Sequence, residues 1–267
     1  RKGAIVGGLQ TIVCIKQVPD TNEVKMDPER GTLIREGVPA IINPFDTYAI
    51  EEGIRLKEAH GGKTTVVTMG PPKALDAIKE AVAMGCDDGV LISDRAFAGA
   101  DTWATAYTLA QAVRKLGDAD VIVCGRQAAD GDTGQVGPGI ATQLGINQLT
   151  YVSGIREIDL EARTITVERL VEEGCEVVQS SLPCLVTVVK DINQPRYPSF
   201  MGIRKANRAS IPVTTAADLG VSAGNATQWT NIRKPEEAKT DVVMIDGETA
   251  QEKAAKLADA LMAEKVI

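Results

Sequence analysis

The sequence is poor in aromatic side chains, in histidine and in long apolar runs. Phe, Trp and Tyr together make up 3% of the 267 residues, so a protein that stacks nucleic-acid bases on aromatic platforms is not expected. His60 is the only histidine, and a Ser-His-Asp triad or a histidine metal site would depend on it alone. No apolar run approaches the roughly 20 residues that span a bilayer.

The sequence also lacks an excess of positive charge. Lys and Arg number 29 against 36 Asp and Glu, which gives a formal net charge of −7. Proteins that bind nucleic acid or an anionic membrane surface need clustered cations. We therefore expect neither nucleic acid nor a membrane among the partners of this chain.

The cysteines form no recognisable framework. The cysteines are Cys14, Cys86, Cys124, Cys175 and Cys184. Their number is odd, and no pair has the spacing of a zinc knuckle. Free thiols in a reducing compartment are expected instead. Residues 1–10 hold too short an apolar stretch for a secretory signal, so we interpret them as an extension or an expression remnant and expect a cytoplasmic protein.

Between residues 11 and 150, short apolar runs alternate with longer amphipathic segments. The predicted strands are residues 11–16, 64–69, 89–93 and 119–124, and the predicted helices are residues 44–60, 73–84, 101–116 and 137–144. Asn43 is placed to cap the first helix, and Pro44 suits its first position. The alternation predicts an α/β fold with a doubly wound, mainly parallel, Rossmann-like sheet.

The pattern changes after residue 150. Residues 151–158 and 164–171 alternate between apolar and polar, which indicates an antiparallel ribbon at the sheet edge. Residues 184–189 form one more apolar run of the kind found in buried strands. Residues 190–235 show no clear periodicity, which suits an arm lying on another protein better than part of a compact domain. An amphipathic helix is predicted over residues 249–263.

These patterns divide the chain into three parts. An N-terminal extension covers residues 1–10, and a nucleotide-binding α/β domain covers residues 11–210. A C-terminal arm and helix, residues 211–267, is expected to pack on another subunit. Within the domain, the polar stretch after the first strand is expected to form a small hairpin around Gly31.

One glycine-rich segment is the best candidate for binding a ligand. In doubly wound folds, ligands bind beyond the carboxyl ends of the strands, and residues 125–138 (GRQAADGDTGQVGP) follow such a strand. The glycines let the backbone approach a ligand closely. The helix expected after this segment adds partial positive charge, and Arg126 adds a full one. The segment therefore favours the phosphate of a nucleotide, against the alternative of an ordinary surface loop.

The segment matches no common phosphate-binding signature. GxGxxG is absent after the first strand, and the Gly-Lys-Thr at residues 62–64 lacks the first glycine of a P-loop. Asp130 and Asp132 could be taken as magnesium ligands, but two isolated carboxylates are more typical of turn caps. We therefore expect no metal ion and, with a single histidine, no Ser-His-Asp triad among the catalytic possibilities.

Six ordered motifs carry a resemblance to a known family. They are VCIKQVPD at 13–20, INPFDTYAIEEGIRLKE at 42–58, TMGPP at 68–72, AMGCD at 83–87, GRQAADGDTGQVGP at 125–138 and VERLVEEGCEVVQSSLPCLVTV at 167–188. Over residues 11–210 the chain resembles the beta subunit of electron-transfer flavoproteins. The resemblance implies an adenine-nucleotide-binding domain that pairs with an alpha subunit, which carries a mobile FAD.

The resemblance also implies which residues bind. The cofactor-binding positions would be Cys14, Asn43, Pro44, Phe45, Asp46, Met69, Gly70, Gly125, Arg126, Gln127, Ala128, Asp130, Gly131, Asp132, Thr133, Gly134, Gln135 and Val136. Residues 193–197 (NQPRY) are similar to the loop by which the family recognises its partner. We expect Ile192 to be an apolar anchor on a dehydrogenase, with Pro195, Arg196 and Tyr197 beside it. The alternative for Ile192 is a plain core contact.

Two classes of this family differ in the nucleotide of the beta subunit. Housekeeping members hold AMP as a structural piece. Electron-bifurcating members hold a second FAD, which accepts hydride from NADH; the electrons then go to ferredoxin or flavodoxin and, through the alpha-subunit FAD, to an acyl-CoA dehydrogenase. The segment at 130–138 looks like the bifurcating class, because the housekeeping loop is bulkier and more acidic where Gly131 stands. The bifurcating class is our prediction, and the AMP-binding class is the alternative.

Two interpretations outside this family also stay open. The first is an adenine-nucleotide-sensing module without a redox role, against which the long segment after residue 190 counts. The second is an ATP-pyrophosphatase-like enzyme. That enzyme needs a Ser- and Gly-rich phosphate loop after the first strand, where this sequence has Lys-Gln-Val-Pro-Asp at 16–20.

Overall fold

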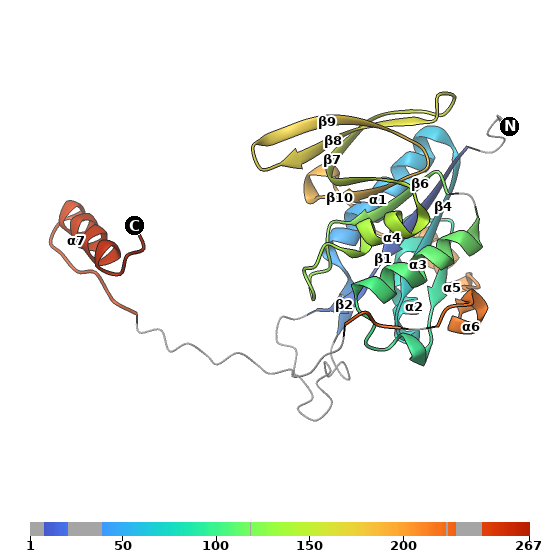
Figure 1. Cartoon of the computed structure of the whole chain (residues 1–267), viewed down its shortest axis with the longest axis horizontal. Helices are drawn as coiled ribbons and strands as arrows, with labels where there is room; N and C mark the ends of the chain where they lie inside the picture. The colour runs from blue at the N-terminus through green and yellow to red at the C-terminus, as the bar shows by residue number, and fades with distance from the viewer. Residues whose placement is uncertain (1–7, 21–38, 118, 223, 228–241) are drawn as a thin grey trace. The chain divides into compact units, whose positions relative to one another are not determined.

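The computed structural model describes residues 8–20, 39–117, 119–222, 224–227 and 242–267 (Figure 1). Its contacts divide the chain into two compact units, Arg1–Thr230 and Asn231–Ile267. The hairpin predicted around Gly31 lies outside the described residues. Within the described ranges, every helix is too short or too polar to cross a membrane.

The first unit is built on one large mixed sheet. Its nine strands follow the order β11-β5-β4-β1-β6-β10-β7-β8-β9. Neighbouring strands from β11 to β7 run parallel, while β8 and β9 continue the sheet antiparallel. The strands are β1 (Leu9–Ile15), β4 (Gly62–Met69), β5 (Asp88–Ile92), β6 (Val121–Gly125), β7 (Asn147–Asp159), β8 (Thr164–Val171), β9 (Gly174–Ser181), β10 (Cys184–Val188) and β11 (Val213–Thr214). The predicted α/β fold with a mainly parallel sheet is confirmed.

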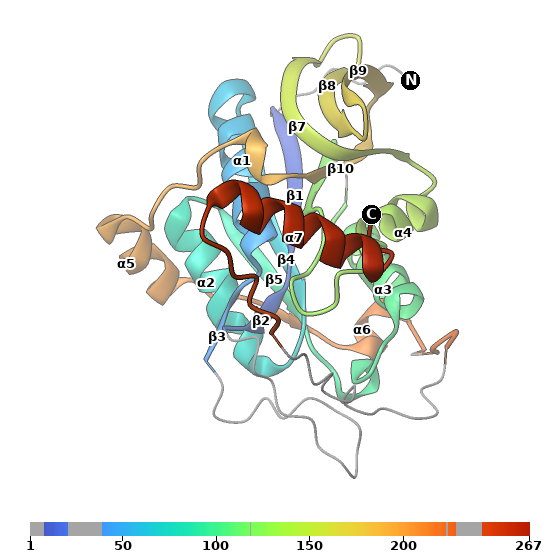
Figure 2. The ribbon, with the colours of Figure 1, turned by 90° about the vertical axis from the view of Figure 1, so that its left-hand side faces the viewer.

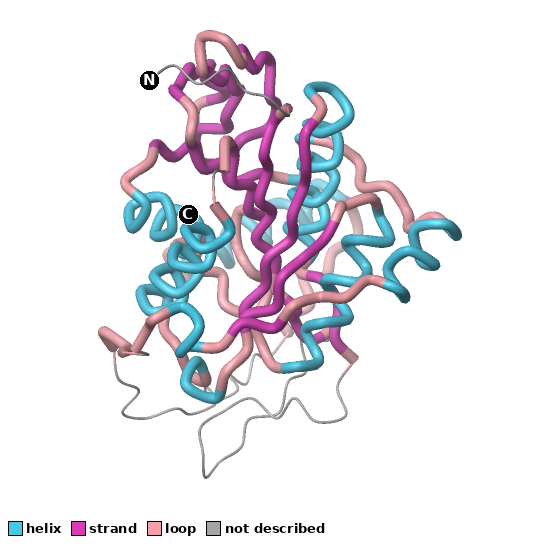
Figure 3. Tube along the Cα trace, turned by 90° about the vertical axis from the view of Figure 1, so that its right-hand side faces the viewer, coloured by secondary structure: helices cyan, strands magenta, loops and turns pink. Residues whose placement is uncertain are grey.

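Helices cover both faces of the parallel strands (Figure 3). On one face α1 packs on β1 and β6, and α2 packs on β5. On the other face α3 and α4 pack together, and α4 also contacts β10. The helices are α1 (Pro44–His60), α2 (Leu75–Met84), α3 (Thr102–Leu116), α4 (Val136–Leu144), α5 (Phe200–Arg208) and α6 (Ala216–Leu219). A short antiparallel pair, β2 (Gln17–Pro19) and β3 (Ala40–Ile42), precedes α1.

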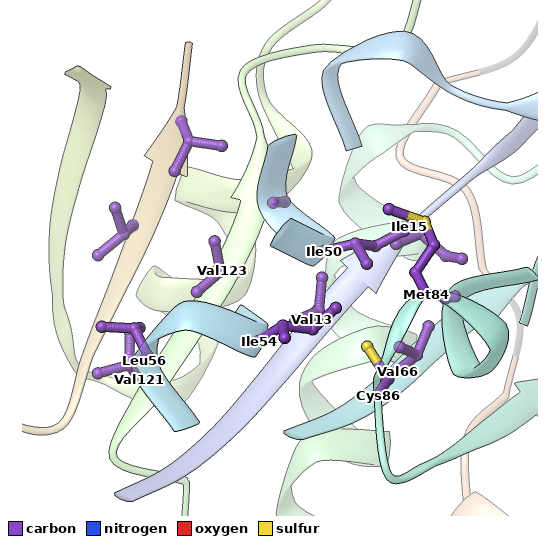
Figure 4. Close-up of a cluster of buried hydrophobic side chains, with 14 of the residues drawn as sticks. Val13, Ile15, Ile50, Ile54, Leu56, Val66, Met84, Cys86, Val121 and Val123 are labelled. Atoms are coloured by element: carbon purple, nitrogen blue, oxygen red, sulfur yellow. The ribbon is translucent and has the colours of Figure 1, made fainter. Parts of the chain in front are cut away.

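Two hydrophobic clusters, one on each face of the sheet, form the core. Figure 4 shows part of the first, in which Ile54 of α1 lies against Val13 of β1. The second includes Leu109 of α3 and Ile140 of α4. Burial of apolar side chains on both faces explains why these parallel strands are continuous apolar runs in the sequence.

The first helix begins and ends where predicted, but Asn43 does not cap it. Pro44 is its first residue, and Gly61, with φ +69°, ends it. Asn43 stands at the N-cap position, yet its side chain bonds to residues 127 and 129 instead of to the helix. The capping prediction was wrong because the Asn43 side chain makes its hydrogen bonds to this loop and none to the helix N–H groups.

Residues 190–221 also differ from the expected arm. They fold onto their own chain, because α5 packs on α2 (Figure 2) and β11 pairs with β5 at the sheet edge. Ser199 and Thr215 cap α5 and α6. The short elements and the prolines between them hide any periodicity from the sequence.

The second unit contains α7 (Ala250–Ala263), as the amphipathic pattern predicted. Thr249 caps it by accepting a hydrogen bond from the Glu252 N–H. No α7 residue is buried, and Leu257 on its apolar face is exposed. The described residues of this unit, 242–267, therefore leave the apolar face of α7 unburied.

Candidate functional site

The carboxyl ends of β1 and β6 bring the candidate site together. Within the sheet, β1 has β4 as its neighbour on one side and β6 as its neighbour on the other, so the order of the strands reverses at β1. Such a reversal opens a crevice at the strand ends, where doubly wound folds bind ligands. The loops after β1, before α1 and after β6 meet here. They hold most of the residues predicted to bind a cofactor.

Asn43 joins the loop before α1 to the loop after β6. Its side-chain amide donates to the Gln127 carbonyl oxygen at 2.8 Å and accepts from the Ala129 N–H at 3.0 Å. Asn43 is almost completely buried. Both hydrogen bonds go to backbone groups, so Asn43 fixes the course of the glycine-rich loop.

Polar side chains hold the rest of that loop. Lys16 Nζ lies 2.6 Å from Asp130 Oδ1, and Gln127 Nε2 donates to Asp132 Oδ1 at 2.7 Å. Asp132 itself has left-handed backbone, with φ 52°. Thr102 at the start of α3 donates to Gln135 Oε1 at 3.0 Å. The carboxylates of Asp130 and Asp132 therefore both have side-chain partners within the chain.

Asp46 is a buried carboxyl beneath this loop. It accepts a hydrogen bond from the Lys16 N–H at 2.7 Å and one from the Gly125 N–H. Burial raises its pKa from the ordinary 3.8 to about 7, although these hydrogen bonds pull in the opposite direction. Asp46 therefore ties the ends of β1 and β6 to the start of α1 from below.

The stability of the chain should depend on the ionisation of Asp46. The folded state keeps the Asp46 proton to about pH 7, whereas the unfolded chain loses it near 3.8, so Asp46 weakens the fold as pH rises between these values. From pH 5 to pH 8 we expect the free energy of unfolding of the wild type, relative to Asp46→Asn, to fall by roughly 2.5 kcal/mol. Urea unfolding at the two pH values measures it. If the difference in the free energy of unfolding between the wild type and Asp46→Asn is the same at pH 5 and pH 8, the pKa of Asp46 is not raised in the folded state.

Arg126 is a second cation of the site, in addition to Lys16, and lies over two aromatic rings. Its guanidinium carbon is 5.3 Å from the ring centroid of Phe45 and 5.3 Å from that of Tyr151. Arg126 Nε donates to Gln127 Oε1 at 2.9 Å. No protein acceptor for its Nη atoms is found among the described residues, which leaves these donors for an anion.

The start of α4 adds uncompensated N–H groups. Its N-cap residue, Gln135, has no side-chain hydrogen bond to the helix, and Val136 and Gly137 follow at the first positions. Gly137 packs closely below, because a Cβ there would lie 2.8 Å from a methyl group of Thr187. An uncapped helix start at the end of the loop that carries Arg126 suits a phosphate.

Gly131, in the loop after β6, is open on the side where a side chain would stand. A Cβ at this position would meet no other atom of the described chain within 4 Å. Thr133 is exposed nearby, and Gly134 has φ +61°. The donors and the open side of Gly131 thus fit a single phosphate or a pyrophosphate.

Some predicted site residues lie apart from this surface. Cys14 is buried beside Cys124, its partner in the β1–β6 register, and the two thiols are hydrogen-bonded. That hydrogen bond and burial raise the pKa of Cys124. Met69 and Gly70 are half-buried at the end of β4, and Pro44 is exposed. The Cys14 side chain therefore supports the site from inside the core.

The loop predicted to recognise a partner is held firmly on α1. The Arg196 guanidinium bonds to both carboxylate oxygens of the buried Glu51, at 2.8 and 2.9 Å, and also to Glu58. Pro195 is half-buried, whereas Tyr197 is 93% exposed. Ile192 is only 8% exposed and belongs to the core. In the structure, Ile192 therefore makes a core contact, which was the alternative interpretation of this residue, and does not form an exposed anchor for a partner.

Several residues at these places were not singled out in the sequence. Lys16 and Tyr151 contact the glycine-rich loop from elements far away in the chain, and only the fold brings them there. Phe200 and Met201 extend the exposed surface beside Tyr197, with 75% and 68% exposure. The pair of large apolar residues after the NQPRY stretch was the signal that could have identified this surface.

Comparison with known proteins agrees with this arrangement. A model of the electron transfer flavoprotein domain matches residues 30–219. A protein of Thermoanaerobacterium thermosaccharolyticum, called electron transfer flavoprotein subunit beta, is 53% identical over 214 residues, which cover 80% of this chain and 81% of that protein. The family match therefore spans both the glycine-rich loop and the loop on α1.

Two further relatives carry other names. The FixA protein of Azorhizobium caulinodans is 44% identical, over 96% of this chain and 93% of that protein. The CarD subunit of the caffeyl-CoA reductase–Etf complex of Acetobacterium woodii is also 44% identical, over 97% of this chain and the whole of that protein. Similarity to these proteins extends over nearly the full chain.

Proposed function

Because this chain belongs to the electron transfer flavoprotein family and is similar to its beta subunits, we propose that it binds a second FAD in a heterodimer with an alpha subunit. It would take part in electron bifurcation from NADH to two acceptors. The acceptors would be ferredoxin or flavodoxin and, through the alpha subunit, an acyl-CoA dehydrogenase. FAD bound here would supply hydride acceptance and electron release, which no side chain of the site can supply.

The side chains of the site would bind and orient the nucleotide. Arg126 and the N–H groups at the start of α4 would bind its phosphates. Asn43 would hold the loop in the conformation that receives them, and Asp46 would hold the strand ends below. No general acid or base is required of the protein in this proposal.

The open space at Gly131 is the observation that supports FAD over AMP. A pyrophosphate and the ribityl chain attached to it need more room than a single phosphate. In the proposed complex, the open space beside Gly131, where a Cβ would meet no described atom within 4 Å, would supply this room. AMP, the nucleotide of the housekeeping class, would bind through the same donors. Family membership argues against the sensing module and the ATP-pyrophosphatase interpretation.

An acyl-CoA-linked partner is supported by one relative. CarD is, by its name, a subunit of a complex with caffeyl-CoA reductase. An enzyme acting on an acyl-CoA is therefore a reasonable acceptor for this chain as well. A cytoplasmic location would follow from such partners.

Coupled electron transfer tests the proposal. The purified heterodimer, NADH, ferredoxin, an acyl-CoA dehydrogenase and its enoyl-CoA substrate are combined under anaerobic conditions. We expect ferredoxin reduction only when the dehydrogenase and its substrate are both present, because the two electron branches must proceed together. The proposal would be refuted if ferredoxin were reduced in the absence of the dehydrogenase, or if the heterodimer did not react with NADH.

The surface around residues 197–203 would bind the dehydrogenase. Tyr197, Phe200, Met201 and Ile203 are all exposed there, and buried aromatic anchors dominate the energy of many interfaces. Arg196 would keep this surface in place through Glu51 and Glu58.

Removing the anchors should weaken that interface. We expect Phe200→Ser combined with Met201→Ser to weaken dehydrogenase binding at least tenfold, as measured by calorimetry with the heterodimer. Leu116→Ser is the control, because Leu116 is exposed at the end of α3. Equal affinity for the double variant and the wild type would rule this surface out.

The C-terminal unit would contact the alpha subunit. The apolar face of α7, which includes Ala254, Leu257 and Leu261, is not buried by any of the described residues of its own unit. We propose that the alpha subunit covers this face, as was expected for the C-terminal arm. Leu257→Asp would then weaken the association of the two subunits.

A further inference from the structure

Tyr151 adopts a backbone conformation that tyrosine rarely adopts. Its φ is 59°, in the left-handed region, where a bulky side chain is a real outlier. Such conformations persist only where the surrounding structure holds them, and they gather at functional sites. Tyr151 was not predicted as a site residue from the sequence. Its rare backbone conformation nevertheless requires an explanation.

An extra residue in β7 produces this conformation. Leu149 pairs with Val186 and Val152 with Val188, so β7 has one residue more than β10 across this interval. The Tyr151 N–H has left the regular ladder and donates to the Thr187 hydroxyl at 3.2 Å. Bulges of this kind commonly redirect a side chain next to a site.

The bulge directs the Tyr151 ring to Arg126. The guanidinium carbon lies 5.3 Å from the ring centroid, the same distance as to Phe45. The Arg126 backbone is held in the same region, because its N–H donates to the Val188 carbonyl oxygen at 3.0 Å. Tyr151 is 44% exposed, so burial of the ring does not account for the unusual backbone.

We propose that Tyr151 is a positioning residue, which holds the Arg126 guanidinium over its ring so that the Nη atoms meet a nucleotide phosphate. A guanidinium fixed over aromatic rings loses less side-chain freedom when it binds an anion. The proposal rests on the nucleotide site described above. It needs only the phosphate, whether this belongs to FAD or to AMP.

Substitution of Tyr151 tests this role with two matched variants. Tyr151→Asn removes the ring but tolerates left-handed backbone, and Tyr151→Phe keeps the ring. In heterodimers stripped of nucleotide, the affinities for FAD and for AMP are measured by titration, and the thermal midpoint without nucleotide is recorded. We expect Tyr151→Asn to bind about tenfold more weakly with an unchanged midpoint, and Tyr151→Phe to bind like the wild type.

A double variant shows whether the effect passes through Arg126. In the Arg126→Ala background, Tyr151→Asn should cause no further loss of affinity, because the group that it positions is gone. Wild-type affinity in Tyr151→Asn, or an equal loss in both backgrounds, would overturn the proposal. If the wild type binds AMP and not FAD, the proposed bifurcation fails, while the AMP titrations still decide the role of Tyr151.

Discussion

A heterodimer that carries Gly131→Asp is expected to retain one FAD instead of two. The open space around Gly131 should let the aspartate enter without disturbing the fold. Its carboxylate would then stand beside the pyrophosphate. Two like charges about 4 Å apart repel by about 4 kcal/mol near a protein surface, which corresponds to roughly a thousandfold loss of affinity.

Gly131→Asn separates charge from size in this experiment. Asparagine has nearly the same volume as aspartate and no charge, so it should lose much less FAD. The nucleotides are released with acid and counted by chromatography. If Gly131→Asp still carries two FAD, Gly131 does not lie at the phosphates and the argument for a second FAD loses its main support.

Gly125→Ala should disrupt the fold and the site together. A Cβ at Gly125 would collide with the Asp46 carboxylate and lie 2.7 Å from the Phe45 carbonyl carbon and 2.9 Å from the Asp46 nitrogen. The last two are backbone atoms at the start of α1 and cannot move aside alone. Overpacking of this kind destabilises by about 3 kcal/mol, so we expect a lower thermal midpoint and loss of the bound nucleotide.

Gly154→Ala is the control for that substitution. Gly154 lies in β7, where a Cβ would meet nothing in the described chain nearer than 3.9 Å. Its thermal midpoint and nucleotide content should equal those of the wild type. If Gly125→Ala folded and bound like Gly154→Ala, the close approach of β6 to α1 would not matter for the site.

The fold was predictable because strands and helices here have simple periodicity. Buried parallel strands such as β6 are continuous apolar runs, and α1 is bounded by Pro44 and Gly61. The glycine-rich loop was found because it follows such a strand. Local signals of this kind require no knowledge of what lies next to them in space.

Other features depend on contacts between distant residues. Asn43 looks like a helix cap in the sequence, but the loop at 127–129 takes its side chain. Ile192 looks like a surface anchor, but the fold places it in the core. The position of Tyr151 follows from a register shift between β7 and β10, which no local pattern reveals. These features became visible only with the fold.

Counting the nucleotides of the heterodimer tests the central claim most directly. The chain is purified together with its alpha subunit, the nucleotides are released with acid, and FAD and AMP are separated by chromatography. Two FAD and no AMP per heterodimer is the predicted result. One FAD with one AMP would contradict it and would make this chain a subunit of the housekeeping class.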